Sequence, residues 1–317
     1  MGTHDKLFKA VFSEPANAVV HFESFLPAEV TAALDLGRAQ HVPGSFVDEA
    51  LSERHTDLLY SIPWQQESDA DDREVLLYVL FEHQSSVDSL MTFRMLRYAV
   101  RVWDQWLKEH PEQKLLPPIL PLVLYHGDQE WTAATELQDL FDLEGVVPQA
   151  VDALRPFLPQ LQIMVDEVGS IPDEKLPGQG VVRLTLLLFK HGRGPEVLKQ
   201  LPLWEDEFRI ELARGKPGLQ NLTLLVTYLM TVNEHVTVDA LAEFLEPMGD
   251  EAKEIPMSIV QQQREEGRQE GRQEGRQEGR QEALLQTARR LLARGMAPAD
   301  VAEATELPLE EVQRLAH

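Results

Sequence analysis

The feature that most limits the fold of this chain is an apolar run, residues 75–81, that ends directly in the polar tripeptide Glu82-His83-Gln84. A short apolar run of this kind is typical of a buried strand. Side chains alternate between the two faces of a strand, so Glu82 and Gln84 are predicted to share one face while His83 points to the other. The sequence therefore predicts a carboxylate and an amide side by side at the end of a buried strand.

A second alternating run, residues 54–62, contributes another acidic residue, Asp57. If this run pairs with the first through the acidic segment 67–73, Asp57 lies beside Glu82. Neighbouring carboxylates repel one another, and a divalent ion with oxygen ligands relieves the repulsion. Magnesium takes one or two protein carboxylates together with water and phosphate oxygens, which suits phosphodiester cleavage. The alternative is that Asp57 caps a turn and Glu82 simply ends its strand in solvent.

Charge and composition narrow the classes of function. The chain has 317 residues, enough for one or two domains, and 53 acidic against 29 basic residues give a net charge of −24. Broad nucleic-acid binding rests on basic side chains that displace counterions, so any DNA contact is expected to be local. Candidates for such contacts are Lys6, Lys9, Arg94, Arg97, Arg101 and the arginines from Arg264 onward.

The absence of cysteine and of long apolar stretches indicates in which cellular compartment the protein is expected. Without cysteine the chain forms no disulfide, no thiolate zinc site and no cysteine nucleophile, which suits a reducing cytosol. No stretch is apolar for long enough to span a bilayer, and the N-terminus lacks the layout of a signal peptide. A cytoplasmic protein without a membrane partner is therefore expected.

The order of the periodic segments predicts an α/β fold. Helices are predicted over residues 5–12, 16–25 and 88–110. Asp88 is the expected N-cap of the third helix. Apolar runs at 119–127 and 161–166 predict two further strands. Strands separated by a long helix imply a crossover connection and a mixed sheet flanked by helices, and from about Val181 onward the pattern is helical.

A tetrapeptide repeat follows the helical half. Gly-Arg-Gln-Glu occurs four times over residues 267–282. Four residues advance an α-helix by about 40° more than a full turn, so each residue type forms a slowly drifting stripe. Arg and Glu lie on opposite sides and cannot pair within one helix, but a second copy can present its Glu stripe to this Arg stripe. A homo-oligomer formed through this helix and a solvated, partly frayed spacer are both open, because each interior glycine costs about 1 kcal/mol relative to alanine.

An apolar pattern returns in the last segment. An amphipathic helix over 283–294 is closed by Gly295, and two short helices around a tight turn follow. The second of these begins with Glu310 and Glu311, whereas a DNA-reading helix carries polar or basic groups there, so a packing or dimerisation unit is favoured. Four parts are expected: an α/β core of residues 1–180, a helical subdomain of residues 181–260 packed on it, the repeat over 261–282 and a C-terminal helical unit of residues 283–317.

Four short motifs occur in an order that resembles the YhgA-like transposase family, also called recombination-promoting nucleases. The motifs are His4-Asp5-Lys6-Leu7-Phe8-Lys9, Thr56-Asp57-Leu58, Phe81-Glu82-His83-Gln84-Ser85 and Pro121-Leu122-Val123-Leu124-Tyr125-His126-Gly127. The resemblance covers roughly residues 4–250 and extends to the repeat and the terminal helices. The family is placed in the PD-(D/E)XK nuclease superfamily, whose fold is a restriction-endonuclease-like mixed sheet flanked by helices.

The resemblance implies roles for individual residues. Asp57 matches the metal-binding aspartate of the second core strand, and Glu82 matches the acidic residue of the following strand. Gln84 stands where the superfamily often has lysine, and a glutamine can orient water or phosphate but supplies no positive charge. Asp5 matches an acidic position of the first helix, with a helix cap as the alternative. His126 has a packing role at its strand end as the alternative to a functional one.

Two functions are therefore open for this chain. The first is a DNA endonuclease that depends on Mg²⁺, or on Mn²⁺ or Ca²⁺, and acts in recombination or in a mobile element. Asp57 and Glu82 would hold the ion, Gln84 would position the attacking water, and Arg94, Arg97 or Lys9 would steady the phosphate. The second is a DNA-binding or assembly protein that keeps the nuclease fold without efficient catalysis, which the missing lysine and the net charge favour.

Overall fold

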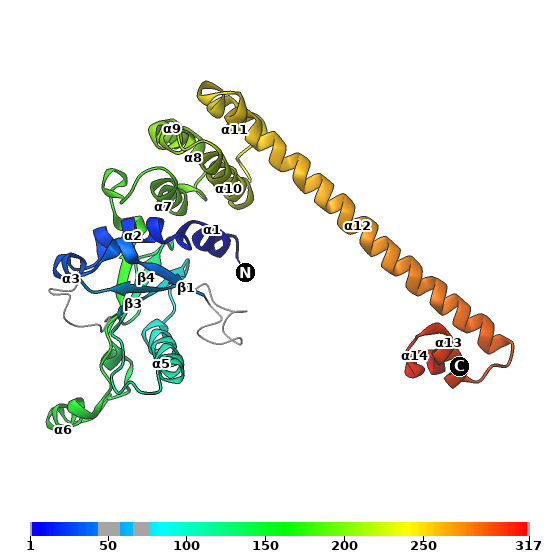
Figure 1. The fold of residues 1–317 in the computed structure, drawn as a ribbon, viewed down its shortest axis with the longest axis horizontal. Coiled ribbons are helices and arrows are strands. Elements are labelled where there is room, and N and C mark those ends of the chain that lie inside the picture. Colours follow the sequence, from blue (N-terminus) through cyan, green and yellow to red (C-terminus); the bar gives the residue numbers. More distant parts are fainter. Residues whose placement is uncertain (1, 44–57, 66–75, 316–317) are drawn as a thin grey trace. The chain divides into compact units, whose positions relative to one another are not determined.

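A computed structural model describes residues 2–43, 58–65 and 76–315 of the chain (Figure 1). The chain divides into two compact units, Met1–Pro256 and Met257–His317. The first unit is built on a mixed five-stranded sheet with helices on both faces. The prediction of an α/β fold, with a mixed sheet flanked by helices and a helical C-terminal half, is confirmed. The four-part division of the chain stays a prediction.

The strands of the sheet lie in the order in which they occur in the sequence. They are β1 (Gln40–Val42), β2 (Leu58–Pro63), β3 (Leu76–Gln84), β4 (Ile119–Tyr125) and β5 (Met164–Glu167). The first three strands are antiparallel neighbours, whereas β3, β4 and β5 are parallel. The predicted pairing of the first two long runs is confirmed, because β2 and β3 pair with Leu58 opposite Phe81. The acidic segment between them lies outside the described residues.

One face of the sheet is covered by α5 (Met91–Glu109), the crossover between the parallel strands β3 and β4 (Figure 1). Tyr78 and Leu80 of β3 pack there against apolar residues of the helix. The α5 residues in this cluster are Met91, Met95, Tyr98 and Val102. They recur at intervals of three and four residues, which places them on one stripe of the helix. This is the face that strand alternation assigns to Glu82.

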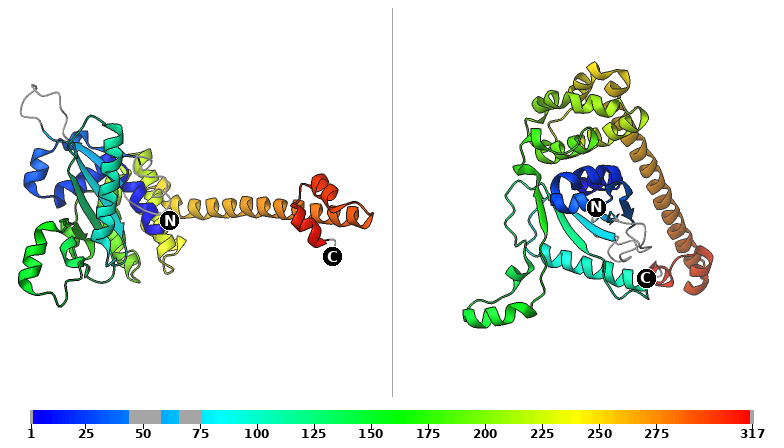
Figure 2. Two further views of the ribbon diagram at one scale, coloured as in Figure 1. Left: turned by 90° about the horizontal axis from the view of Figure 1, so that it is seen from below. Right: turned by 60° about the vertical axis from the view of Figure 1, so that its left-hand side comes forward.

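The opposite face is covered by α1 (Thr3–Phe12), α2 (Pro15–Phe25) and α7 (Val181–His191). The Phe81 ring of β3 points into this layer, with centroids 4.9 Å from Phe8 and 5.4 Å from Phe12 and Phe22. Burying each such ring contributes about 1.5–3 kcal/mol. α9 (Glu205–Leu212) and α10 (Lys216–Val232) form the next layer, and α10 packs on α1 and α7 (Figure 2).

Acidic side chains of α9 hold the start of α7. Glu211 Oε2 accepts the Val181 N–H at 2.9 Å, and Glu207 Oε2 accepts the Gly180 N–H at 2.7 Å. Carboxylates are favourable at a helix N-terminus, where backbone N–H groups have no partner within the helix. Gly180 has φ +55°, and a Cβ there would lie 2.4 Å from Glu211 Oε2, so this turn requires glycine. Part of the large negative charge therefore has a structural role.

The sequence predicted the long elements and missed several short ones. The helices α1, α2 and α5 begin and end within a few residues of their predicted bounds, and α7, α10 and α11 (Val238–Leu245) lie in the half that was predicted to be helical. The strand β1 and the helices α3 (Ala28–Ala33), α6 (Pro148–Leu154), α8 (Val197–Gln200) and α9 were not predicted. Most of them span too few residues to show a hydrophobic period.

The second unit contains most of α12 (Asp250–Ala293), together with α13 (Pro298–Thr305) and α14 (Leu309–Leu315). The repeat is helical, and self-association through it stays a prediction. The end of α12 closes with α13 and α14 around a small core of Ala288, Val301, Leu307 and Val312. Glu310 is exposed at the start of α14. Within the described parts of the chain, no helix is both long and apolar enough to cross a membrane.

Candidate active site

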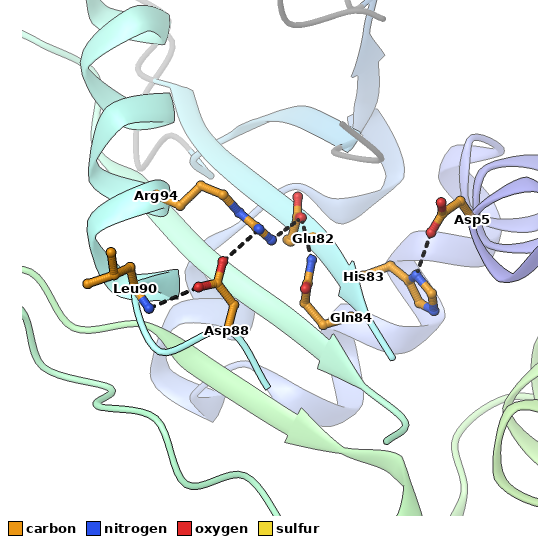
Figure 3. Close-up of polar contacts among 7 residues, drawn as sticks. All are labelled: Asp5, Glu82, His83, Gln84, Asp88, Leu90 and Arg94. Atoms are coloured by element: carbon orange, nitrogen blue, oxygen red, sulfur yellow. Dashed lines mark hydrogen bonds and ion pairs between the residues drawn. The ribbon is translucent and has the colours of Figure 1, made fainter. Parts of the chain in front are cut away.

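Glu82 lies near the end of β3, on the face of the sheet that α5 covers, and is only 1% exposed (Figure 3). A buried carboxylate is stable only where charge or hydrogen bonds compensate for lost water. Its Oε1 atom accepts two hydrogen bonds of 2.7 Å each, one from Gln84 Nε2 and one from Arg94 Nη2. The predicted placement of Glu82 beside Gln84 is confirmed, and the alternative in which Glu82 ends its strand in solvent is wrong.

The second carboxylate oxygen of Glu82, Oε2, is buried and has no hydrogen-bond partner among the residues that the structure describes. Leaving a buried acceptor unpaired costs about 1–3 kcal/mol, and more for a charged group. Both donors are on Oε1, so they fix the carboxylate and leave the charge on Oε2 without a compensating donor among the described residues. A hard divalent cation suits such an oxygen.

Arg94 joins Glu82 to a second carboxylate. While Nη2 contacts Glu82, Nη1 donates to Asp88 Oδ2 at 2.7 Å. The other oxygen of Asp88 accepts the Leu90 N–H at 2.9 Å, just before α5 begins. The predicted N-cap role of Asp88 is therefore wrong, since Leu90 occupies the N-cap position and Asp88 orders the turn before it. The Arg94 side chain is 22% exposed, whereas its Nε atom is buried.

Asp57, the second predicted metal ligand, lies outside the described residues, and its role stays a prediction. The residue after it, Leu58, begins β2 opposite Phe81, the neighbour of Glu82. Among the described residues, no group of three or more His, Cys, Asp or Glu side chains is arranged to hold a metal ion. A divalent ion at Glu82 therefore needs further oxygen ligands from other residues, water or substrate.

The side chain of His83 points to the opposite face of the sheet, as predicted (Figure 3). Its Nδ1 atom donates to Asp5 Oδ1 at 3.2 Å, and this hydrogen bond lowers the pKa of the Asp5 carboxyl. Asp5 Oδ2 accepts the Gly2 N–H at 2.8 Å at the start of α1. The structure thus assigns Asp5 to capping and to His83, and it does not bring Asp5 to Glu82.

His83 belongs to a histidine cluster with His4 and His126. The ring centroids of His83 and His4 lie 4.7 Å and 4.9 Å from that of His126, and the Phe189 ring stacks on His126 at 4.5 Å. His126 Nδ1 donates to the Phe189 carbonyl at 3.3 Å. Burial lowers the pKa of all three histidines, that of His126 to about 2, so they are neutral near pH 7. The structure places His126 in packing rather than beside Glu82.

Sequence reasoning missed two features of this region. The contact between Arg94 and Glu82 joins a helix to a strand, and the histidine cluster joins three separate segments. The sequence offers Arg94 beside Arg97 and Lys9 as a candidate to steady the phosphate, without a signal that selects it among the three. The spacing of twelve residues between Glu82 and Arg94 does not predict their contact, because the contact depends on how the crossover helix α5 lies against β3.

The family described as "Putative transposase, YhgA-like" matches residues 2–214 of the chain. The chain belongs to this family. The match includes β3, with Glu82 and Gln84, and the helix α5 that carries Arg94. The resemblance predicted from the four motifs is thereby confirmed.

Relatives cover nearly the whole chain. Recombination-promoting nuclease RpnA of Escherichia coli (strain K12) is 26% identical over 310 residues, 98% of this chain and 95% of that protein. Recombination-promoting nuclease RpnC of the same strain is 29% identical over 316 residues, 98% of this chain and 96% of that protein. The inactive recombination-promoting nuclease-like protein RpnE, also of that strain, is 27% identical over 268 residues, 83% of this chain and 82% of that protein. No solved structure matches the chain.

Proposed function

We propose that this protein is a DNA endonuclease acting in recombination and that its active site lies at the Glu82 end of β3. The observation that carries the proposal is the buried Oε2 atom of Glu82, which has no partner among the described residues while two donors fix the other oxygen. Relatives of nearly the same length are named recombination-promoting nucleases, which supports the reaction class. A cytoplasmic location is part of the proposal, and the absence of cysteine supports it.

Magnesium, with manganese or calcium as substitutes, is the proposed cofactor. Glu82 would hold the ion through Oε2, and Asp57 would supply the second carboxylate. When bound, such an ion polarises the phosphodiester and lowers the pKa of the attacking water. Gln84 holds Glu82 through Oε1 and can also orient a water molecule. Assignment to the PD-(D/E)XK superfamily rests on the antiparallel β2–β3 pair, followed by the parallel strand β4.

A second candidate function has its own support. A relative that matches over most of its length is named inactive, and Gln84 provides no positive charge on β3. In this alternative the chain keeps the nuclease fold and acts as a DNA-binding or assembly protein. Self-association through the repeat in α12 would fit this function as well as the first.

Nicking of supercoiled plasmid in the presence of Mg²⁺ separates the two candidates. Glu82→Gln keeps the shape of the side chain and removes its charge, and Asp57→Asn does the same at the second position. We expect each variant to lose nicking activity by about 100-fold or more, because a bound ion supplies several kcal/mol of transition-state stabilisation. The control is Glu112→Gln, at an exposed position. Equal nicking by the wild type and both variants, or no Mg²⁺-dependent nicking at all, would refute the endonuclease.

A further inference from the structure

The proposed active site needs a positive charge that β3 does not provide. Cleavage of a phosphodiester places negative charge on the phosphate oxygens, and a cationic side chain stabilises it. Gln84 carries no charge, and burial lowers the pKa of His83, whose ring is on the other face. The cationic side chain that contacts Glu82 comes from α5, where Arg94 Nη2 lies 2.7 Å from Glu82 Oε1.

We propose that Arg94 is the phosphate-binding cation of this site, and that its guanidinium group passes from Glu82 to a substrate phosphate when a divalent ion occupies Glu82. The inference rests on the proposed endonuclease function and adds a residue to it. A planar guanidinium group donates two parallel hydrogen bonds to a phosphate, which an ammonium group cannot do. Arg94 therefore does more than balance the charge of Glu82.

The contacts of Arg94 fit a side chain held ready for this exchange. One end of the guanidinium group is anchored by Asp88 Oδ2 at 2.7 Å, and Asp88 is itself fixed by the Leu90 N–H. The end that contacts Glu82 is the end that would be released. Arg94 Nε is buried and has no hydrogen-bond partner among the described residues, so the group keeps an unused donor. Asp88 is thus a positioning residue for Arg94.

Arg94 and a divalent ion compete for the Glu82 carboxylate, so removal of Arg94 should change ion binding and cleavage in opposite directions. In the described state Arg94 is the cation paired with Glu82, and a divalent ion bound at the same carboxylate is repelled by it. Removing the Arg94 charge should therefore strengthen divalent-ion binding while it weakens cleavage. A merely structural ion pair would weaken both, because its loss would disorder Glu82.

The test measures two quantities on the full chain at a pH of about 8, where carboxylates are ionised. Calorimetry gives the affinity for Mn²⁺ alone, and plasmid nicking at saturating Mn²⁺ gives the activity. We expect Arg94→Met to bind Mn²⁺ about tenfold more tightly, as the loss of one charge-assisted hydrogen bond at Glu82 implies. We expect its nicking rate to fall about 100-fold, as for removal of one transition-state donor.

Two further variants complete the design. Arg209→Met removes an exposed arginine that also pairs with a carboxylate, Glu205, and should leave both quantities unchanged. Arg94→Lys keeps the charge without the planar fork, and nicking should fall about tenfold. If Arg94→Met does not fold, Arg94→Lys decides, and unchanged nicking by the lysine variant overturns the proposal.

The outcomes separate this inference from the endonuclease itself. If the wild type nicks DNA and Glu82→Gln does not, but Arg94→Met nicks as well as the wild type, only the role of Arg94 is overturned. Weaker Mn²⁺ binding by Arg94→Met also overturns it, because the ion pair is then structural. If the wild type neither binds Mn²⁺ nor nicks DNA, both proposals fall together.

Discussion

Acid is expected to destabilise the first unit through the histidine cluster, and His126 gives the sharpest test. Burial lowers the pKa of His126 to about 2, whereas a histidine in an unfolded chain titrates near 6.5. Between these values the unfolded chain binds a proton that the folded chain does not, so the free energy of unfolding falls as the pH falls below about 6.5. One such histidine contributes a slope of about 1.4 kcal/mol per pH unit. About 2 kcal/mol is therefore lost between pH ~6.5 and pH ~5.

The variant His126→Phe removes the titrating group and keeps a ring that can stack on Phe189. It also loses the hydrogen bond to the Phe189 carbonyl, which lowers stability at every pH, so the comparison is between two pH values within each protein. Urea unfolding followed by tryptophan fluorescence reports the first unit, because every tryptophan of the chain precedes residue 256. We expect the wild type to lose about 2 kcal/mol more than the variant between pH ~7.5 and pH ~5. Equal losses in the two proteins would refute the reasoning.

Two further predictions concern the helical half and the repeat. Glu211→Ala should lower the free energy of unfolding by about 2–4 kcal/mol, because the Val181 N–H and the Asn221 amide lose their acceptor. Glu205→Ala, which removes an exposed ion pair, should cost less than about 1 kcal/mol, and equal costs in urea unfolding would contradict the capping role. Removal of residues 264–317 should reduce the oligomeric state measured by light scattering, if the repeat self-associates. The same oligomeric state with and without these residues would contradict self-association.

Strand alternation was sufficient to place the central pair of the site. A period of two residues fixes which side chains share a face, so Glu82 and Gln84 were predicted together and His83 apart. The pairing of the two strands also predicted Asp57 beside Glu82, but Asp57 lies outside the described residues and this placement stays a prediction. Burial of Glu82 could not be predicted, because it depends on how α5 lies over the end of β3.

Contacts between distant segments account for most of what the sequence did not reveal. Arg94 reaches Glu82 only once the crossover places the start of α5 beside the end of β3. The histidine cluster needs α1, β3 and the end of β4 to meet, and no spacing in the sequence encodes that meeting. Asp5 matches an acidic first-helix position of the family with a helix cap as the alternative, and its contact with His83 lies on the face of the sheet opposite to Glu82. Asp88 was expected to be the N-cap of α5, but Leu90 holds that position and the Asp88 side chain accepts the Leu90 N–H in the turn that leads into the helix.

The central claim is that Glu82 Oε2 is a ligand of a divalent ion in a nuclease active site. Anomalous scattering from Mn²⁺ in crystals of the full chain locates such an ion directly. The account predicts an ion coordinated by Glu82 Oε2, on the face of the sheet covered by α5, with Arg94 still bound to Asp88. Manganese bound only elsewhere, with Glu82 Oε2 hydrogen bonded to water, would contradict it.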